Sequence, residues 1–285
     1  MISIFFIRLI SLFPLRLLYI ISDLLRIIVQ YLFKYRVNVV NKNLNLASKH
    51  FSFKNLSIIK KDFYKYFIDL YLEVIKMDNL SERFFLKNFD VQNIDLLNKY
   101  YNEGKSVILM LSHYSGYEWC VSLPYFIKHH VVGVYSPMSN KKVDRFIRKS
   151  RAKHGMSLIS RYSAFRDILK IEKEGSPTLY GLVADQSPQL SSKNLLWTKF
   201  LGQEVPVFTG SENIAKKFNL PVIYGEMSKI KRGKYKIEFK LISESPVEEN
   251  EYDITKKYLE LIEKQINNDP SLYLWTHNRF KHAKN

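Results

Sequence analysis

The first 33 residues form a mostly apolar segment with only four charges, at Arg8, Arg16, Asp23 and Arg26. A transmembrane helix needs about 18 or more apolar residues without charge, and this segment has no such stretch. It also lacks the small-residue cleavage site that ends a secretory signal peptide. We therefore expect a helix that either crosses the bilayer at a tilt, with its arginines reaching the surface, or lies among the lipid headgroups. A helix buried in the protein core is the alternative.

Basic residues follow this apolar segment directly, at Lys34, Arg36 and Lys42. Positive charge next to a membrane segment is typical of the cytoplasmic side, so we expect the rest of the protein on that side. No linker rich in Gly, Pro or Ser divides the remaining chain. We therefore divide the protein into a membrane anchor over residues 1–40 and one folded domain over residues 41–285.

Residues 41–100 have helical periodicity, which is clearest in residues 55–77. The apolar positions of that segment, three or four residues apart, are Phe63, Phe67, Leu70, Val74 and Met77. Strand-like apolar runs then alternate with helical segments. The expected strands are 106–111, 131–135, 157–159 and 178–183, and the helices between them cover 116–127, 140–154 and 163–174. This alternation predicts a mostly parallel sheet covered by helices.

The last third of the chain departs from that alternation. Two strand-like runs, 221–228 and 234–242, flank KIKRG and predict an antiparallel hairpin with Gly233 in its turn. A final helix is expected over 253–267. The predicted fold class is therefore α/β, with a mostly parallel mixed sheet flanked by helices and a membrane-anchoring helix at the N-terminus.

The charge of the chain indicates an anionic partner. It carries 44 Lys and Arg against 27 Asp and Glu, a net charge of +17, which fits nucleic acid, an anionic membrane or an acidic protein. Residues 140–173 alone hold eleven basic residues against three acidic ones. The sequence has no nucleic-acid-binding motif, and its aromatic residues fall at core spacing or in the apolar N-terminal segment. We therefore expect no nucleic acid and favour a membrane or an acidic protein.

Metal ions and cofactors are not expected. Cys120 is the only cysteine, so neither an internal disulfide nor a zinc site built on cysteines can form. His129, His130 and His154 have no partners at metal-ligand spacing. We expect Cys120 to pack in the core.

The candidate catalytic residues lie directly after a buried strand, in the segment LSHYSGYE. Catalytic groups gather at the carboxyl ends of strands in open α/β sheets. His113 and Glu118 form an H-x4-E pattern, and on one continuous helix they would diverge by about 140°. We therefore place His113 in the turn and Glu118 in the first helical turns, where Glu118 accepts a hydrogen bond from the imidazole. The other ring nitrogen is then free to act as a general base towards a substrate hydroxyl. Ser115 is not expected to be a nucleophile, because no G-x-S-x-G elbow surrounds it.

Several ordered segments together resemble the bacterial lipid A biosynthesis (lauroyl/myristoyl) acyltransferases of the lysophospholipid acyltransferase superfamily. They are LFPLRLLYIISDLLRIIVQYLFKYR, VVNKNLNLA, LSHYSGYE, RKSRAKHGMSLISR, LVADQSP, FLGQEVPVFTG and YLWTHNRFK, and they span nearly the whole chain. Glycerophosphate acyltransferases of this superfamily usually have Asp at the fifth position after the histidine and an F-P-E-G block. Neither is present, which favours the lipid A branch.

The resemblance implies roles for individual residues. His113 and Glu118 match the catalytic pair. Arg151, four residues before Gly155, matches an arginine that contacts anionic substrate, and Arg148 is its neighbour. Asp185 and Gln186 match a D-Q element at the end of the expected strand 178–183 and are assigned to substrate binding.

The resemblance also implies an activity and a location. We expect transfer of an acyl chain from an acyl carrier protein or coenzyme A thioester to a hydroxyl of a lipid A precursor, at the inner membrane. A lysophospholipid or an acylated amino-acid lipid is the alternative acceptor, and a catalytically silent membrane-binding relative is the alternative to an enzyme. In the closing YLWTHNRFK, we expect Tyr273 and Trp275 to pack under the sheet, and Arg279 and Lys281 to face anionic lipid.

Overall fold

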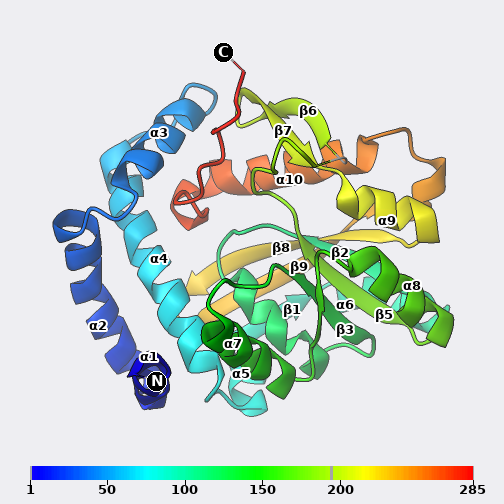
Figure 1. Cartoon of the computed structure of the whole chain (residues 1–285), viewed down its shortest axis with the longest axis horizontal. Coiled ribbons are helices and arrows are strands. Elements are labelled where there is room, and N and C mark those ends of the chain that lie inside the picture. The colour runs from blue at the N-terminus through cyan, green and yellow to red at the C-terminus, as the bar shows by residue number, and fades with distance from the viewer. Residues whose placement is uncertain (1, 193–194, 285) are drawn as a thin grey trace.

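A seven-stranded sheet with the strand order β1-β9-β8-β2-β5-β3-β4 forms the centre of the protein (Figure 1). The computed structural model describes residues 2–192 and 195–284, with side chains from residue 6 onward. The strands are β1 (Phe89–Gln92), β2 (Val107–Leu111), β3 (His130–Tyr135), β4 (Ser157–Ser160), β5 (Thr178–Val183), β8 (Val222–Lys231) and β9 (Lys234–Ser243). All neighbouring strands are parallel except β8 and β9, which form an antiparallel hairpin.

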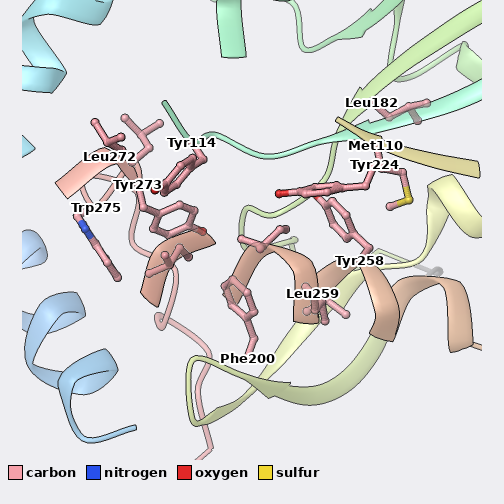
Figure 2. Packing of buried hydrophobic residues seen from close by; sticks show 14 of the residues in the cluster. Met110, Tyr114, Leu182, Phe200, Tyr224, Tyr258, Leu259, Leu272, Tyr273 and Trp275 are labelled. Carbon is pink, nitrogen blue, oxygen red and sulfur yellow. The ribbon is translucent and has the colours of Figure 1, made fainter. Parts of the chain in front are cut away.

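Helices cover both faces of the sheet, and alternate side chains of β2 belong to two different buried clusters, one on each face. Ile108 and Met110 of β2 belong to a cluster that includes α8 (Ala164–Glu174), α9 (Gly210–Phe218) and α10 (Asp253–Asn268). Figure 2 shows Met110 close to Tyr258 of α10. Leu109 and Leu111 instead pack with α5 (Glu82–Asn88), α6 (Ile94–Asn102) and the 3₁₀ helix η2 (Tyr117–Tyr125). The predicted α/β class with a mostly parallel mixed sheet is confirmed.

The N-terminal third of the chain is helical. Its elements are α1 (Ile2–Leu12), α2 (Leu15–Ile27), the π-helix η1 (Ile28–Leu32), α3 (Val37–Ser48) and α4 (Leu56–Met77). The apolar segment is thus two helices rather than the single helix we expected. Pro14 stands between them with extended backbone angles (φ −58°, ψ 144°) and cannot donate the backbone hydrogen bond that a continuous helix would need. Among the described residues, none of the helices has the length and apolar character needed to cross a bilayer.

A buried polar network attaches α2 to α4. The Tyr19 hydroxyl donates to Glu73 at 2.7 Å, and the Ser22 hydroxyl donates to Asp69 at 2.6 Å. Arg232, in the β8–β9 turn, donates to Asp69 at 2.7 Å. Buried polar groups cost free energy unless they are paired, so these contacts fix one face of α2 against the folded body.

Most of the predicted elements are present at the predicted places. The helix over 55–77, the four strands, the hairpin with Gly233 at φ +68° and the last helix are all confirmed. The helix expected over 116–127 is a 3₁₀ helix over Tyr117–Tyr125, with Pro124 near its end. The strand β1 and the hairpin of β6 (Leu195–Phe200) and β7 (Gln203–Phe208) were not predicted. The remaining elements are α7 (Lys141–Lys153) and the short 3₁₀ turns η3 (Pro246–Glu248) and η4 (Pro270–Leu272).

Candidate active site

Sheet register brings His113 and Asp185 together. Strands β2 and β5 are parallel neighbours, and their last residues, Leu111 and Val183, are register partners. His113 and Asp185 each follow two residues beyond those partners, at the same edge of the sheet. The carboxyl ends of parallel strands form the usual site of ligands and catalytic groups in α/β folds, and the sequence placed both residues there.

Asp185 orients the His113 ring. Its Oδ1 lies 2.7 Å from His113 Nδ1 and also accepts the His113 backbone N–H at 3.1 Å. Asp185 is only 1% exposed. Burial alone would raise the pKa of the Asp185 carboxyl, but the nearby His113 ring and these hydrogen bonds outweigh burial and hold that pKa below its ordinary value. A carboxylate at Nδ1 places the ring proton on that nitrogen, which leaves the lone pair on Nε2.

Gln186 lies at the second nitrogen of the same ring. Its side-chain Nε2 is 3.2 Å from His113 Nε2 and donates to the lone pair there. The His113 side chain retains 18% of its exposure, and His113 and Gln186 both border the same cavity. A hydroxyl that entered this cavity would meet the Nε2 lone pair in the place that the Gln186 amide occupies.

Glu118 contacts Arg151 instead of the imidazole. Arg151 Nη2 donates to both carboxylate oxygens of Glu118, at 2.7 and 3.0 Å. The Glu118 carboxylate raises the pKa of the Arg151 guanidinium, so Arg151 stays charged. The hydrogen bond that we predicted between Glu118 and the His113 ring is therefore wrong, and Asp185 occupies that place. The physical reason is that the strand register positions Asp185 beside the ring, while Glu118 in η2 meets a permanent cation at the end of α7.

The turn between His113 and Glu118 is tightly constrained. Ser115 has a φ of 54°, in the left-handed region that residues with a side chain seldom adopt. A Cβ on Gly116 would lie 2.6 Å from Cδ1 of Tyr235, so the ring can pack there only against glycine. This close approach explains the glycine inside the H-x4-E segment.

A cavity of about 290 Å³ joins the predicted site residues. Five of the six line it: His113, Glu118, Arg148, Arg151 and Gln186. Asp185 is the sixth and lies against the His113 ring. Arg161 adds a third guanidinium to the wall, a residue that we did not predict as part of the site. Three arginines beside the His113 imidazole suit an anionic ligand, because guanidinium groups form paired, charge-assisted hydrogen bonds with phosphate.

Two smaller apolar cavities adjoin the charged one. One, of about 90 Å³, lies over Gly133 and Gly181 of the sheet, and the other, of about 240 Å³, lies between α1, α4 and α7. Tyr117, Glu118 and Arg151 border all three cavities. Apolar walls suit hydrocarbon chains, so chains in both cavities would end near the charged groups.

The C-terminal segment lies beside the site, where Leu274 donates its backbone N–H to the His113 carbonyl at 3.1 Å. Tyr273 and Trp275 are buried, as predicted. Arg279 does not face lipid as we expected. It is 1% exposed, its Nη1 donates to the Pro206 carbonyl at 3.2 Å, and its guanidinium lies 5.0 Å from the Phe200 ring centroid. The hairpin β6–β7 covers this arginine, and that hairpin was not predicted.

His277 was also missed as a residue near the site. Its Nε2 accepts the backbone N–H of Ser187 at 2.9 Å, immediately after Asp185 and Gln186. The motif YLWTHNRFK was visible in the sequence, but only the fold brings it to the catalytic edge.

One protein-family model covers nearly the whole chain. The family model described as bacterial lipid A biosynthesis acyltransferase matches residues 1–282. Among solved structures, the chain is similar to the crystal structure of the 1-acyl-sn-glycerophosphate (LPA) acyltransferase, PlsC, from Thermotoga maritima. The identity is 15% over 88% of this chain and 97% of that chain, with a TM-score of 0.39. No curated protein matches the sequence significantly. The match over nearly the whole chain shows that this protein belongs to the bacterial lipid A biosynthesis acyltransferase family.

Proposed function

We propose that this acyltransferase moves a fatty acyl chain from an acyl thioester, carried by an acyl carrier protein, to a hydroxyl of a lipid A precursor. The observation that carries the proposal is the His113–Asp185 hydrogen bond of 2.7 Å. It leaves the imidazole Nε2 facing a cavity lined by three arginines. A base beside a cationic cavity suits a phosphorylated lipid that bears a free hydroxyl.

The reaction follows from the protonation state of the ring. The acceptor hydroxyl replaces the Gln186 amide at Nε2 and gives its proton to that nitrogen as its oxygen attacks the thioester carbonyl. Asp185 stabilises the imidazolium that forms. Backbone N–H groups at the start of η2 stabilise the oxyanion. The C–S bond then breaks, and the imidazolium returns its proton to the departing thiolate, so that ester and free thiol are the products.

Glu118 acts in this proposal through Arg151. The two short contacts from Arg151 Nη2 hold the guanidinium at the junction of the three cavities. There it meets the anionic group of a substrate whose chains occupy the apolar cavities. Arg148 and Arg161 on the same wall supply further positive charge.

An acidic donor protein fits the neighbouring surface. Arg145, Arg148 and Lys149 of α7 line an open depression of about 620 Å³ beside the charged cavity. A carrier protein with acidic surface residues would be attracted there by charge complementarity. Coenzyme A is the alternative donor, because its phosphates suit the same basic residues.

In this proposal, the N-terminal helices bind the membrane. Large apolar side chains of α1, α2 and η1 remain exposed, namely Phe6, Leu9, Leu12, Leu17, Ile20, Leu24, Ile27, Tyr31 and Leu32. The opposite face of α2 is fixed to α4 by Tyr19 and Ser22. A helix that is held on one side and apolar on the other is suited to lie in the headgroup region of a bilayer. We propose the cytoplasmic face of the inner membrane as the location.

Mass spectrometry of total lipids from cells with and without the gene tests this function. We expect lipid A species that lack one acyl group when the gene is deleted, restored by the intact gene and not by His113→Ala. Loss of an acyl group from a phospholipid or an amino-acid lipid would assign another acceptor. Unchanged lipids under conditions in which the protein is made would contradict the proposal.

A further inference from the structure

The C-terminal segment Leu272–Arg279 contacts the catalytic edge of the sheet through its backbone. Leu274 donates its N–H to the His113 carbonyl at 3.1 Å, and Ser115 donates its N–H to the Leu272 carbonyl at 2.8 Å. Tyr114 and Tyr273 form the antiparallel bridge between these contacts, and their side chains lie close together in Figure 2. The segment therefore fixes the turn that carries the catalytic histidine.

The same segment also contacts the chain that follows Asp185 and Gln186, through the side chain of His277. The Ser187 N–H donates to His277 Nε2 at 2.9 Å, one residue after Gln186. Because an amide N–H can only donate, Nε2 must be the unprotonated nitrogen of this ring. Burial lowers the pKa of His277 to about 4, so the ring is neutral and able to accept this bond at physiological pH.

Helix α3 holds the segment from the other side. The buried Asn43 side-chain amide donates to the Trp275 carbonyl at 2.9 Å and to the His277 carbonyl at 2.7 Å. Arg36 Nη1 donates to the Thr276 carbonyl at 2.9 Å. A backbone held at three successive carbonyls leaves the imidazole little freedom to move, so the position of Nε2 determines that of Ser187.

We infer that His277 is a positioning residue for acyl transfer, which fixes the Asp185–Gln186 strand end against the His113 ring by accepting the Ser187 amide. The inference rests on the proposed function, because it assigns a part in the same reaction. Asp185 and Gln186 contact the two nitrogens of one imidazole, so a shift of their backbone changes both contacts together. Misplacement of a catalytic group by about 1 Å can lower the rate about 100-fold.

Matched substitutions of two histidines test this assignment in the full-length protein. His277→Leu removes the acceptor, whereas His277→Gln can keep an oxygen acceptor close to the position of Nε2. His282, in the same tail but outside these contacts, provides the control through His282→Leu. We expect kcat of His277→Leu to fall at least about tenfold, towards the 100-fold cost of a misplaced catalytic group, with a much smaller change in KM. His277→Gln should recover most of kcat, and His282→Leu should match the parent.

A spectroscopic readout separates this inference from the proposed function. The proton on His113 Nδ1 should give a downfield proton resonance, identified by its loss in Asp185→Asn. We expect that resonance to move or disappear in His277→Leu and to persist in His277→Gln. Absence of acyl transfer by the parent protein would contradict the proposed function, while these spectra would still test the positioning role.

Three outcomes would overturn the inference. They are a parent-like kcat in folded His277→Leu, equal losses in His277→Leu and His277→Gln, and an unchanged downfield resonance in His277→Leu. If circular dichroism shows that His277→Leu is unfolded, His277→Asn takes its place, because its shorter side chain does not reach the Ser187 amide. Folded His277→Asn should then lose kcat, and parent-like turnover of that variant would contradict the role.

Discussion

His113 and Asp185 share a 2.7 Å contact between ring Nδ1 and carboxylate Oδ1, because they follow adjacent parallel strands at matching positions. The carboxylate fixes both the orientation of the ring and the nitrogen that carries its proton. An amide in its place could donate to Nδ1 and favour the wrong tautomer. We expect Asp185→Asn to lower kcat by about 100-fold or more.

This prediction is checked by steady-state acyl transfer over a range of pH. The exposed α6 residue Asp95 provides a matched control, and Asp95→Asn should leave kcat unchanged. Full activity of Asp185→Asn would show that the ring needs no carboxylate partner.

The Glu118–Arg151 pair predicts coupled effects on substrate binding. Each partner holds the other through contacts of 2.7 and 3.0 Å. Glu118→Gln and Arg151→Ala should each raise the KM for the phosphorylated acceptor, and the double variant should add little to either. Coupling of about 0.5–3 kcal/mol is typical of groups in direct contact. A double-mutant cycle in kcat/KM measures it. Additive losses would contradict the coupling between Glu118 and Arg151. A fall of kcat in Glu118→Gln as large as that in Asp185→Asn would indicate that Glu118 acts on His113 instead.

Glu73 should make stability dependent on pH. Burial raises the pKa of its carboxyl above the ordinary value, and the hydrogen bonds from Trp119, Tyr19 and Tyr235 only partly oppose that rise. A carboxyl whose pKa is raised by folding contributes stability below its unfolded pKa, and this contribution is lost as the pH rises through the folded pKa. The free energy of unfolding of the parent should therefore fall as the pH rises above the ordinary carboxyl pKa. Glu73→Gln cannot ionise at this position, so its free energy of unfolding should fall less.

Urea unfolding at several pH values, compared between the parent and Glu73→Gln, checks this expectation. Glu260→Gln, on the exposed side of α10, is the control and should keep the parent's pH dependence. Identical pH dependence in the parent and Glu73→Gln would refute the assignment.

The exposed face of α2 should bind anionic membranes. Ile20 and Leu24 are 68% and 62% exposed there, and burying such a side chain contributes about 1.5–3 kcal/mol. Ile20→Glu and Leu24→Glu should each weaken binding to vesicles containing anionic lipid by at least tenfold, measured by co-sedimentation. Val247→Glu, on η3, is the control, because Val247 is an apolar residue that is 56% exposed and lies away from α2 in the sequence. If both α2 variants bind vesicles as tightly as the parent, the membrane-binding surface is not the exposed face of α2.

Point substitutions test this surface better than deletion of residues 1–33. Leu18 is completely buried, and Tyr19 and Ser22 hydrogen-bond to α4. Deletion would therefore remove part of the core together with the exposed face. Loss of membrane binding by the deleted protein could then reflect unfolding.

The sequence predicted where the helices and strands lie along the chain better than which strands are adjacent in the sheet. Apolar runs located β2 and β5, the strand end and the H-x4-E pattern pointed to His113, and the resemblance assigned Asp185 to the site. The contact between these residues depends on strand order, because β2 lies next to β5 and not next to β3. Spacing along the chain could not supply that order, and it favoured Glu118 as the partner of His113.

Arg279 and His277 illustrate a second limit of prediction from the sequence. Arginine is seldom fully buried, and Arg279 was expected to face anionic lipid. Its burial depends on the β6–β7 hairpin, which comes from a separate part of the chain. Likewise, nothing adjacent to His277 in the sequence indicates Ser187, 90 residues earlier.

Acyl transfer by the purified full-length protein tests the proposed chemistry most directly. The protein, reconstituted in vesicles, is given an acyl carrier protein thioester and a lipid A precursor with a free hydroxyl, and the lipids are followed by mass spectrometry. We predict a product heavier by one acyl group, formed together with free carrier thiol. This product should be lost in His113→Ala, form at least about 100-fold more slowly in Asp185→Asn, and form at the parent rate in Asp95→Asn. Equal product formation by the parent and folded His113→Ala would contradict a mechanism in which His113 is the base.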